Sequence, residues 1–251
     1  MKQFDFVIVG AGTAGCVLAN RLTAAAGVSV LLLEAGGPYR HPMLPIPMMA
    51  GLSYFVKSTN WNYESAPEPH LNGRRIPWPR GKVLGGTSAI NGMMYMRGHR
   101  RDYDSWAKSG LNGWSYEDVL PYFKYGEGHR ERRDEYHGND GPMIVNRAKS
   151  DNPLYAVFLD ACRQAGHPKT DDFNGAQQEG MGRQDFNIDN GRRVSAATAY
   201  LAPVRGRANL RVVTRAHITR LVFEGGRAAG VEYAHGGRGG IKKSAHAARE
   251  V

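Results

Sequence analysis

Residues 4–15 read FDFVIVGAGTAG, and this stretch decides the fold. Its apolar run, Phe4–Val9, ends in glycines, which is typical of a buried parallel strand. Residues 13–25 then carry apolar side chains at helical spacing, and residues 28–33 form a second apolar run. Strand, helix and strand together predict a βαβ unit of the usual length, about 30 residues.

A glycine motif, Gly10-Ala-Gly12-Thr-Ala-Gly15, joins the predicted strand to the helix. In such a motif the first glycine permits a tight turn and the second lets a pyrophosphate approach the backbone. The third lets helix and strand pack closely. The N-terminus of the helix offers free N–H groups and a partial positive charge to phosphates. We therefore predict that this end of the strand binds a dinucleotide.

An acidic residue, Glu34, directly follows the second strand. A carboxylate at this place accepts hydrogen bonds from the ribose hydroxyls of an adenosine and repels a 2′-phosphate. NADP is therefore disfavoured, whereas NAD and FAD both remain open. Cys16 follows the last glycine of the motif, and we interpret it as a helix-packing residue without a redox role.

A second glycine-rich segment favours FAD over NAD. Residues 80–98 read RGKVLGGTSAINGMMYMRG, in which two adjacent glycines precede Thr87, Ser88 and Asn91. Such a segment offers close backbone approach together with hydroxyl and amide donors. A dehydrogenase that uses NAD does not need a second loop of this kind. FAD does, because its isoalloxazine ring lies far from its adenosine.

The composition describes a globular protein with a basic surface. The 251 residues are 41% hydrophobic, and 33 Lys and Arg against 23 Asp and Glu give a net charge of +10. This balance suits nucleic acid or an anionic cofactor. The arginines collect on no single helix face, so nucleic-acid binding is the weakest alternative and we expect none. The two cysteines have no metal-ligand spacing, so neither a disulfide nor a metal site is expected.

The N-terminal residues predict a location in the cell. MKQFDFVIVG lacks the basic start, long apolar core and cleavage site of a signal peptide. No apolar run approaches the roughly 20 residues that span a bilayer. We expect a cytoplasmic protein, with peripheral membrane contact left open.

The remaining segments predict several further elements. The proline-rich residues 36–80 are interpreted as a surface excursion, a lid over the cofactor. Ser115 with Asp118 predicts a capping box, and Asn152 followed by Pro153 predicts a helix start. Residues 210–213, 218–223 and 228–233 predict a three-stranded meander. The last residues show no helix cap or polar tail, so we expect a chain cut from a longer protein.

Several sequence blocks resemble one family, the glucose–methanol–choline (GMC) oxidoreductases, and in particular their choline dehydrogenase and bacterial alcohol dehydrogenase-like branch. The blocks are LLLEAGG at 31–37, NWNYESAP at 60–67, GKVLGGTSAINGMMYMRGHRRDYD at 81–104, YHGNDGP at 136–142, DDFNGAQQEGMG at 171–182 and GRRVSAATAYL at 191–201. The similarity covers essentially the whole chain, as the N-terminal portion of such an enzyme.

The resemblance implies an α/β fold: a doubly wound, Rossmann-like FAD-binding domain with part of an α+β substrate-binding domain. On this basis residues 1–142 and 191–251 belong to the FAD-binding domain. Residues 143–190 belong to the substrate-binding domain.

The resemblance also implies the chemistry. Relatives oxidise the CH–OH group of an alcohol by hydride transfer to flavin N5, with oxygen or a quinone as the electron acceptor. A small primary alcohol is the expected substrate. Relatives with covalent FAD carry a His before the signature Asn. Here Ile90 stands at that position, so FAD is expected to be non-covalent.

The catalytic His of the family is expected beyond Val251, and none of the nine His residues matches it. Most of the nine lie in polar loops and are interpreted as solvated. The alternative is therefore a catalytically inactive FAD-binding fragment. The residues expected to contact FAD are Gly10, Gly12, Thr13, Ala14, Gly15, Glu34, Ala35, Trp61, Arg80, Gly81, Val83, Gly85, Gly86, Thr87, Asn91, Gly92, Met93, Met94 and Ile218.

Overall fold

The computed structural model describes residues 3–149 and 151–251 and divides the chain into two compact units. The first unit is Met1–Gly92 with Gly191–Val251, and the second is Met93–Asn190. Among the described residues, no helix is long and apolar enough to cross a membrane.

A six-stranded sheet forms the centre of the first unit, with strand order β10-β2-β1-β13-β12-β11. Its strands are β1 Gln3–Val9, β2 Val30–Leu33, β10 Leu210–Val213, β11 Ala216–Glu224, β12 Arg227–His235 and β13 Ile241–Glu250. The pairs β10·β2, β2·β1 and β1·β13 are parallel, and β13·β12 and β12·β11 are antiparallel. The predicted Rossmann-like α/β fold is thus confirmed, with a sheet whose first four strands are parallel and whose last two are antiparallel.

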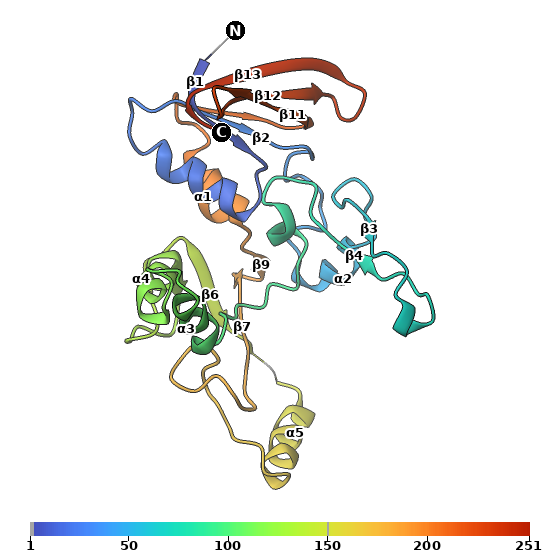
Figure 1. Ribbon diagram of the computed structural model, residues 1–251. Coiled ribbons are helices and arrows are strands. Elements are labelled where there is room, and N and C mark those ends of the chain that lie inside the picture. Colours follow the sequence, from blue (N-terminus) through green and yellow to red (C-terminus); the bar gives the residue numbers. More distant parts are fainter. Residues whose placement is uncertain (1–2, 150) are drawn as a thin grey trace. The chain divides into compact units, whose positions relative to one another are not determined.

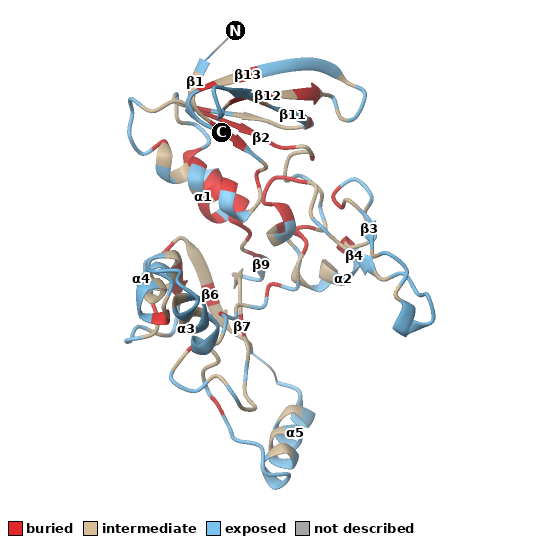
Figure 2. Cartoon of the chain, viewed as in Figure 1, coloured by how far each residue is buried: buried red, intermediate tan, exposed pale blue. Residues whose placement is uncertain are grey.

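The helix α1, Thr13–Leu22, packs against this sheet (Figure 1). Its buried residues are Gly15, Cys16 and Ala19, small enough for close approach to the strands. All four residues of β2 are buried, and buried positions gather on β2 and α1 (Figure 2). Burial of this apolar surface stabilises the strand–helix–strand unit, and it contributes a free energy of about 25 cal/mol per Å² removed from water.

The prediction of a three-stranded meander over residues 210–233 was wrong for its first strand, β10. β10 is not part of it, because it pairs in parallel with β2. The third meander strand is β13, which the sequence did not predict. Its sequence IKKSAHAARE shows mostly polar residues, and only Ala245 and Ala247 are buried.

Residues 36–80 fold onto the first unit through short elements. These are the 3₁₀ turns Pro47–Met49 and Pro69–Leu71, the helix α2 Ala50–Ser53, and the paired strands β3 Tyr63–Glu64 and β4 Pro77–Trp78. Leu44 packs with Val83, Ala89 and Ile90 in a small apolar cluster. This cluster joins the excursion to the second glycine-rich segment, which contains the 3₁₀ turn Gly86–Ala89.

Three short segments complete the first unit after residue 190. They are the strand β9 Arg192–Arg193, a π-helical turn Ala197–Leu201 and the 3₁₀ turn Ala202–Val204. The π-helical turn packs against α1, and Asn20 donates a hydrogen bond to the Tyr200 carbonyl at 2.8 Å.

The second unit combines short strands with three helices. Its elements are α3 Arg100–Lys108, α4 Tyr116–Gly126, β5 Glu127–His129, β6 Met143–Arg147, α5 Pro153–Gln164, β7 Asp185–Phe186 and β8 Ile188–Asp189. The strands β5, β6 and β7 form a three-stranded sheet in that order. The predicted capping box of Ser115 and Asp118 is confirmed at α4, as is the Asn152 cap of α5.

The boundary of the first unit lies at residues 92 and 93, whereas the predicted FAD-binding range extended to residue 142. Residues 93–142 pack with residues 143–190 because polar side chains tie them together. The Arg97 backbone N–H donates to Asn174 Oδ1 at 2.8 Å, and His137 Nε2 contacts Asp172 at 2.8 Å. The assignment of either range to FAD or substrate stays a prediction.

Candidate functional site

A cavity of about 570 Å³ opens in the first unit where β1 and β2 end. This is the carboxyl edge of the parallel strands, where open α/β sheets bind ligands. The cavity is lined by Val9, Gly10, Gly12, Thr13, Glu34, Ala35, Trp61, Tyr63, Arg80, Gly81, Gly86, Thr87, His217 and Ile218.

The glycine motif has the geometry that a phosphate cradle requires. Gly10 has φ +89°, in the left-handed region that favours glycine. A Cβ on Gly15 would lie 1.9 Å from the Gly10 carbonyl oxygen, so the helix could not approach the strand. A Cβ on Gly12 would meet no atom within 4 Å. The space beside Gly12 is therefore open to a ligand, and Gly12 caps α1 without any side chain.

Glu34 is buried at the end of β2, with 5% of its surface exposed. Its Oε2 accepts a hydrogen bond from the Ala11 N–H at 2.8 Å, and its Oε1 accepts one from the Gly36 N–H at 2.7 Å. Burial raises the pKa of the Glu34 carboxyl, and these two N–H donors partly oppose that rise. Each oxygen keeps a further lone pair, so the carboxylate can still accept ribose hydroxyls.

The second glycine-rich segment packs directly on the first. The Gly85 N–H donates to the Ala11 carbonyl at 2.7 Å, and a Cβ on Gly86 would lie 2.8 Å from the Gly12 Cα. Thr87 Oγ1 accepts the Gly81 N–H at 3.1 Å. Two glycine loops distant in sequence thus form one continuous backbone cradle.

Aromatic side chains form another wall of the cavity. Trp61 stacks on Tyr63 with ring centroids 5.8 Å apart, and His217 tilts against Trp61 at 5.9 Å. The Lys82 ammonium lies 4.8 Å from the Trp61 ring centroid. The backbone N–H of Trp61 donates to the Arg80 carbonyl at 2.9 Å, which fixes this wall beside the second loop.

The amino-acid sequence that builds this cavity matches a known family. Residues 4–251 match the GMC oxidoreductase family. The chain belongs to the GMC oxidoreductases. Members of this family are FAD-dependent enzymes, so FAD is the cofactor that this fold implies.

Individual GMC relatives agree with this assignment. The chain is 49% identical to an oxygen-dependent choline dehydrogenase of Burkholderia pseudomallei, over 100% of the chain and 45% of the relative. A pyridoxine 4-oxidase from Mesorbium loti is 35% identical with a TM-score of 0.91, covering 97% of this chain and 48% of that one. An FAD-dependent oxidoreductase from Chaetomium thermophilum is 28% identical with a TM-score of 0.90, covering 98% and 44%. The chain thus spans less than half the length of these relatives.

The structure gathers many of the residues that the sequence predicted for FAD. The cavity is lined by the predicted residues Gly10, Gly12, Thr13, Glu34, Ala35, Trp61, Arg80, Gly81, Gly86, Thr87 and Ile218. Their individual roles toward FAD stay predictions. Val9, Tyr63 and His217 also line the cavity and were not predicted. The available signal for His217 is its position in the sequence, because it directly precedes Ile218 near the start of β11.

Other predicted residues lie outside the cavity lining. Gly15 serves helix packing, and Val83 is 1% exposed within the apolar cluster of Leu44. A Cβ on Gly85 would meet the Ala197 Cβ at 3.1 Å, so Gly85 also serves packing. The remaining residues outside the lining are Ala14, Asn91 and Gly92 in the first unit and Met93 and Met94 in the second.

Two side chains near the loops bear on redox chemistry and attachment. The Cys16 thiol is buried and donates to the Ala11 carbonyl, and burial raises its pKa to about 12. This agrees with a packing role. Ile90 is fully buried and offers no group to attach FAD.

The positions of the glycines in this cradle fit a bound FAD. A side chain at Gly12 would project into the open cavity, and one at Gly86 would collide with the first loop. Glycine at positions 12 and 86 therefore leaves the space next to the free N–H groups of α1 without side chains. A pyrophosphate would take up this space, with Glu34 toward the ribose.

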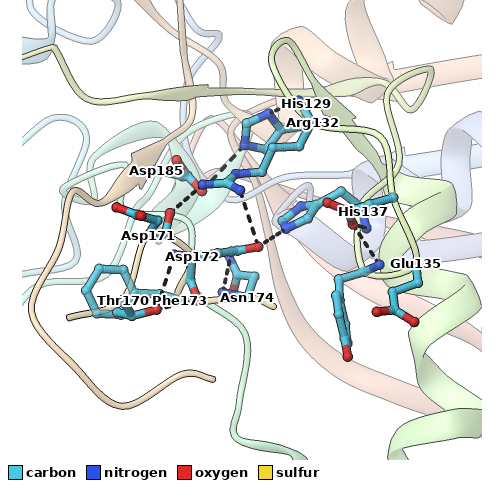
Figure 3. A network of polar contacts seen from close by, with 12 residues as sticks. His129, Arg132, Glu135, His137, Thr170, Asp171, Asp172, Phe173, Asn174 and Asp185 are labelled. Atoms are coloured by element: carbon cyan, nitrogen blue, oxygen red, sulfur yellow. Dashed lines mark hydrogen bonds and ion pairs between the residues drawn. The ribbon is translucent and has the colours of Figure 1, made fainter. Parts of the chain in front are cut away.

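The second unit contains a buried charge network, and Figure 3 shows the part of it around His137 and Asp172. Glu127 is fully buried and binds Arg97 at 2.8 Å and His137 Nδ1 at 3.0 Å. His137 Nε2 contacts Asp172 at 2.8 Å. Burial alone lowers the pKa of His137, but hydrogen bonds to Asp172 and Glu127 outweigh it and raise that pKa to about 9.

Two residues depart from the interpretation that most of the His residues are solvated in polar loops. His129 and His137 are 2% and 1% exposed. Asp134, His137 and Asp172 offer atoms within 4.8 Å of one another, the kind of grouping that could hold a metal ion. Both ring nitrogens of His137 already contact carboxylates, however, so the protonated imidazole neutralises the cluster itself.

Proposed function

We propose that the full-length protein oxidises the CH–OH group of a small primary alcohol with non-covalently held FAD. The observation that carries this proposal is the single cavity formed by two glycine loops and the Glu34 carboxylate. FAD, when bound, accepts a hydride at flavin N5. The residues of this chain hold and orient the cofactor.

Each part of the cavity has a separate task in this proposal. The free N–H groups at the start of α1 bind the pyrophosphate, and the helix dipole favours its negative charge. Glu34 accepts the ribose hydroxyls, and Ile218 flanks the adenine. The loop of Gly86 and Thr87 extends the cradle toward the flavin.

Relatives support the substrate class and the acceptor. One is named an oxygen-dependent choline dehydrogenase and another a pyridoxine 4-oxidase. We therefore propose a small alcohol as substrate and oxygen as acceptor, with a quinone as the alternative. A cytoplasmic location is part of the same proposal.

A second candidate function is an FAD-binding chain without turnover of its own. The titratable groups that line the described cavity favour it. Glu34 is engaged by two backbone N–H groups, and His217 lies against Trp61. Neither is placed as a free general base for an alcohol.

The visible spectrum tests the FAD proposal directly. The 251-residue chain is purified, and its spectrum is recorded before and after acid precipitation. We expect flavin bands that pass into the supernatant, because Ile90 cannot form a covalent link. Flavin retained in the pellet would contradict non-covalent binding. A folded, colourless chain that takes up no added FAD would contradict the site.

Anaerobic reduction separates the two candidate functions. The full-length protein and the 251-residue chain, both loaded with FAD, are each mixed with choline and with a series of other primary alcohols. Bleaching of the flavin band shows hydride transfer and supports the oxidoreductase. Stable FAD binding without bleaching by any alcohol supports the inactive FAD-binding chain.

A further inference from the structure

Arg193 lies inside the first unit, with 3% of its surface exposed. Its Nε donates to the Leu44 carbonyl at 2.9 Å. Its Nη1 donates to the Asn91 carbonyl at 2.7 Å, to Asn91 Oδ1 at 2.8 Å and to the Ser88 carbonyl at 3.3 Å. The backbone N–H of Arg193 adds a bond to the Pro45 carbonyl at 2.9 Å.

The positive charge of this guanidinium has no ionic partner among the described residues. Its Nη2 is buried and has no hydrogen-bond partner there either. Burying a cation without a carboxylate is costly. Neutral carbonyls compensate it only in part, so packing alone does not explain an arginine here.

The acceptors of Arg193 belong to two segments beside the FAD cavity. Ser88 and Asn91 come at the end of the second glycine loop, whose Gly86 and Thr87 line the cavity. Leu44 and Pro45 belong to the excursion of residues 36–80. Ser88 Oγ also accepts the Ala196 N–H at 2.9 Å, so the segment after Arg193 holds the loop a second time.

We propose that Arg193 is a positioning residue of the FAD site, which rests on the FAD binding proposed above. The planar guanidinium fixes residues 86–91 and 44–45 relative to each other. It holds the turn in the shape that closes against the first glycine loop. A lysine cannot replace it, because one ammonium does not reach acceptors on both segments in the same geometry.

The variants for the test are Arg193→Lys and Arg193→Met, with Arg192→Lys and Arg192→Met as matched controls. Arg192 is the exposed neighbour on the same strand. Hydrogen exchange of the apo chain is measured by mass spectrometry. For R193K we expect faster exchange in residues 86–91 and 43–46 and unchanged protection in β1 and β2. The controls should match the wild type.

The second readout is FAD affinity, measured by quenching of flavin fluorescence. We expect R193K to bind FAD roughly 10- to 100-fold more weakly, because it loses hydrogen bonds made by a charged donor. Unchanged exchange in residues 86–91 together with FAD affinity within about twofold of wild type would overturn the proposal.

Two other outcomes are also decisive. If exchange rises equally in β1 and β2 of both Arg193 variants, Arg193 is a general core residue and the positioning role is wrong. If the wild-type chain binds no FAD, the proposed function fails. The exchange of residues 86–91 in R193K then still decides whether Arg193 orders the turn.

Discussion

The two units hold their key segments in different ways. In the first unit the FAD cradle consists of backbone, and its shape depends on missing side chains at Gly10, Gly12 and Gly86. In the second unit buried charges join distant segments, with Glu127 and His137 at the centre. The glycines of the first unit leave space for a ligand, whereas the side chains of the charge network in the second unit pair with one another. Substitutions at cradle positions that face open space should therefore affect binding, and substitutions in the charge network should affect stability.

The largest effect is expected for Gly15→Ala. Its Cβ would lie 1.9 Å from the Gly10 carbonyl oxygen, so α1 must move away from β1. We expect a loss of about 4 kcal/mol or more in the free energy of unfolding, and loss of FAD binding with it. Denaturant unfolding measures the first quantity. Gly206→Ala is the control, because a Cβ there meets nothing within 4 Å.

Gly12→Val should separate binding from stability. Gly12 has φ −72°, which valine adopts freely, and its Cβ would project into open space. We expect the apo chain to lose only about 1 kcal/mol, because valine is a poorer N-cap than glycine. FAD binding should weaken roughly 100-fold, because the side chain occupies the pyrophosphate position. Isothermal titration with FAD measures this. An affinity equal to wild type would place the pyrophosphate elsewhere.

His137→Gln should act on the second unit alone. It leaves Asp172 and Glu127 with fewer donors, and we expect a loss of about 2 kcal/mol with FAD affinity retained. Hydrogen exchange of residues 127–138 reports the local stability. His167→Gln, at an exposed position, is the control. Weaker FAD binding in H137Q would show that the units are not independent.

The same histidine predicts a pH dependence. Its pKa in the folded chain is about 9, above the ordinary 6.5, so the folded state binds this proton more tightly. The stabilisation is full below pH 6.5 and is lost as pH rises through about 9. Wild-type protection of residues 127–138 should therefore fall over this range, and H137Q should lack that slope.

A smaller effect is expected for Glu34→Gln. The NH₂ group of the glutamine would replace one carboxylate oxygen of Glu34. It would then face the buried N–H of Ala11 or Gly36, which needs an acceptor. The ribose hydroxyls would also lose an anionic acceptor. We expect about tenfold weaker FAD binding, measured by fluorescence titration. Glu179→Gln, exposed in the second unit, should bind FAD like wild type.

Local sequence rules predicted the parts of the fold that depend on local chemistry. The βαβ unit, the Ser115 capping box and the Asn152 helix start all follow from neighbouring residues. Both glycine loops of the cavity were found for the same reason, since a tight turn requires glycine at fixed positions.

Features that depend on distant residues were missed. β13 pairs with β1 across the whole chain, and its small buried alanines give little apolar signal. α3 was not predicted, because its sequence RRDYDSWAK has no buried residue. The burial of His137 depends on Glu127 and Asp172, which no local pattern connects. The helix α5 shows the opposite case. Its sequence PLYAVFLDACRQ has apolar residues at helical spacing, which suggests a buried face, yet Leu154 and Val157 are 69% and 63% exposed.

The most direct test compares FAD with FMN as ligands of the same chain. FMN lacks the adenosine that Glu34 and Ile218 are proposed to hold, and it lacks the pyrophosphate over Gly12. Titration of the apo chain should show FAD binding at least roughly 100-fold tighter than FMN. Equal affinity for the two, or binding of neither by a folded chain, would contradict an FAD site in the first unit.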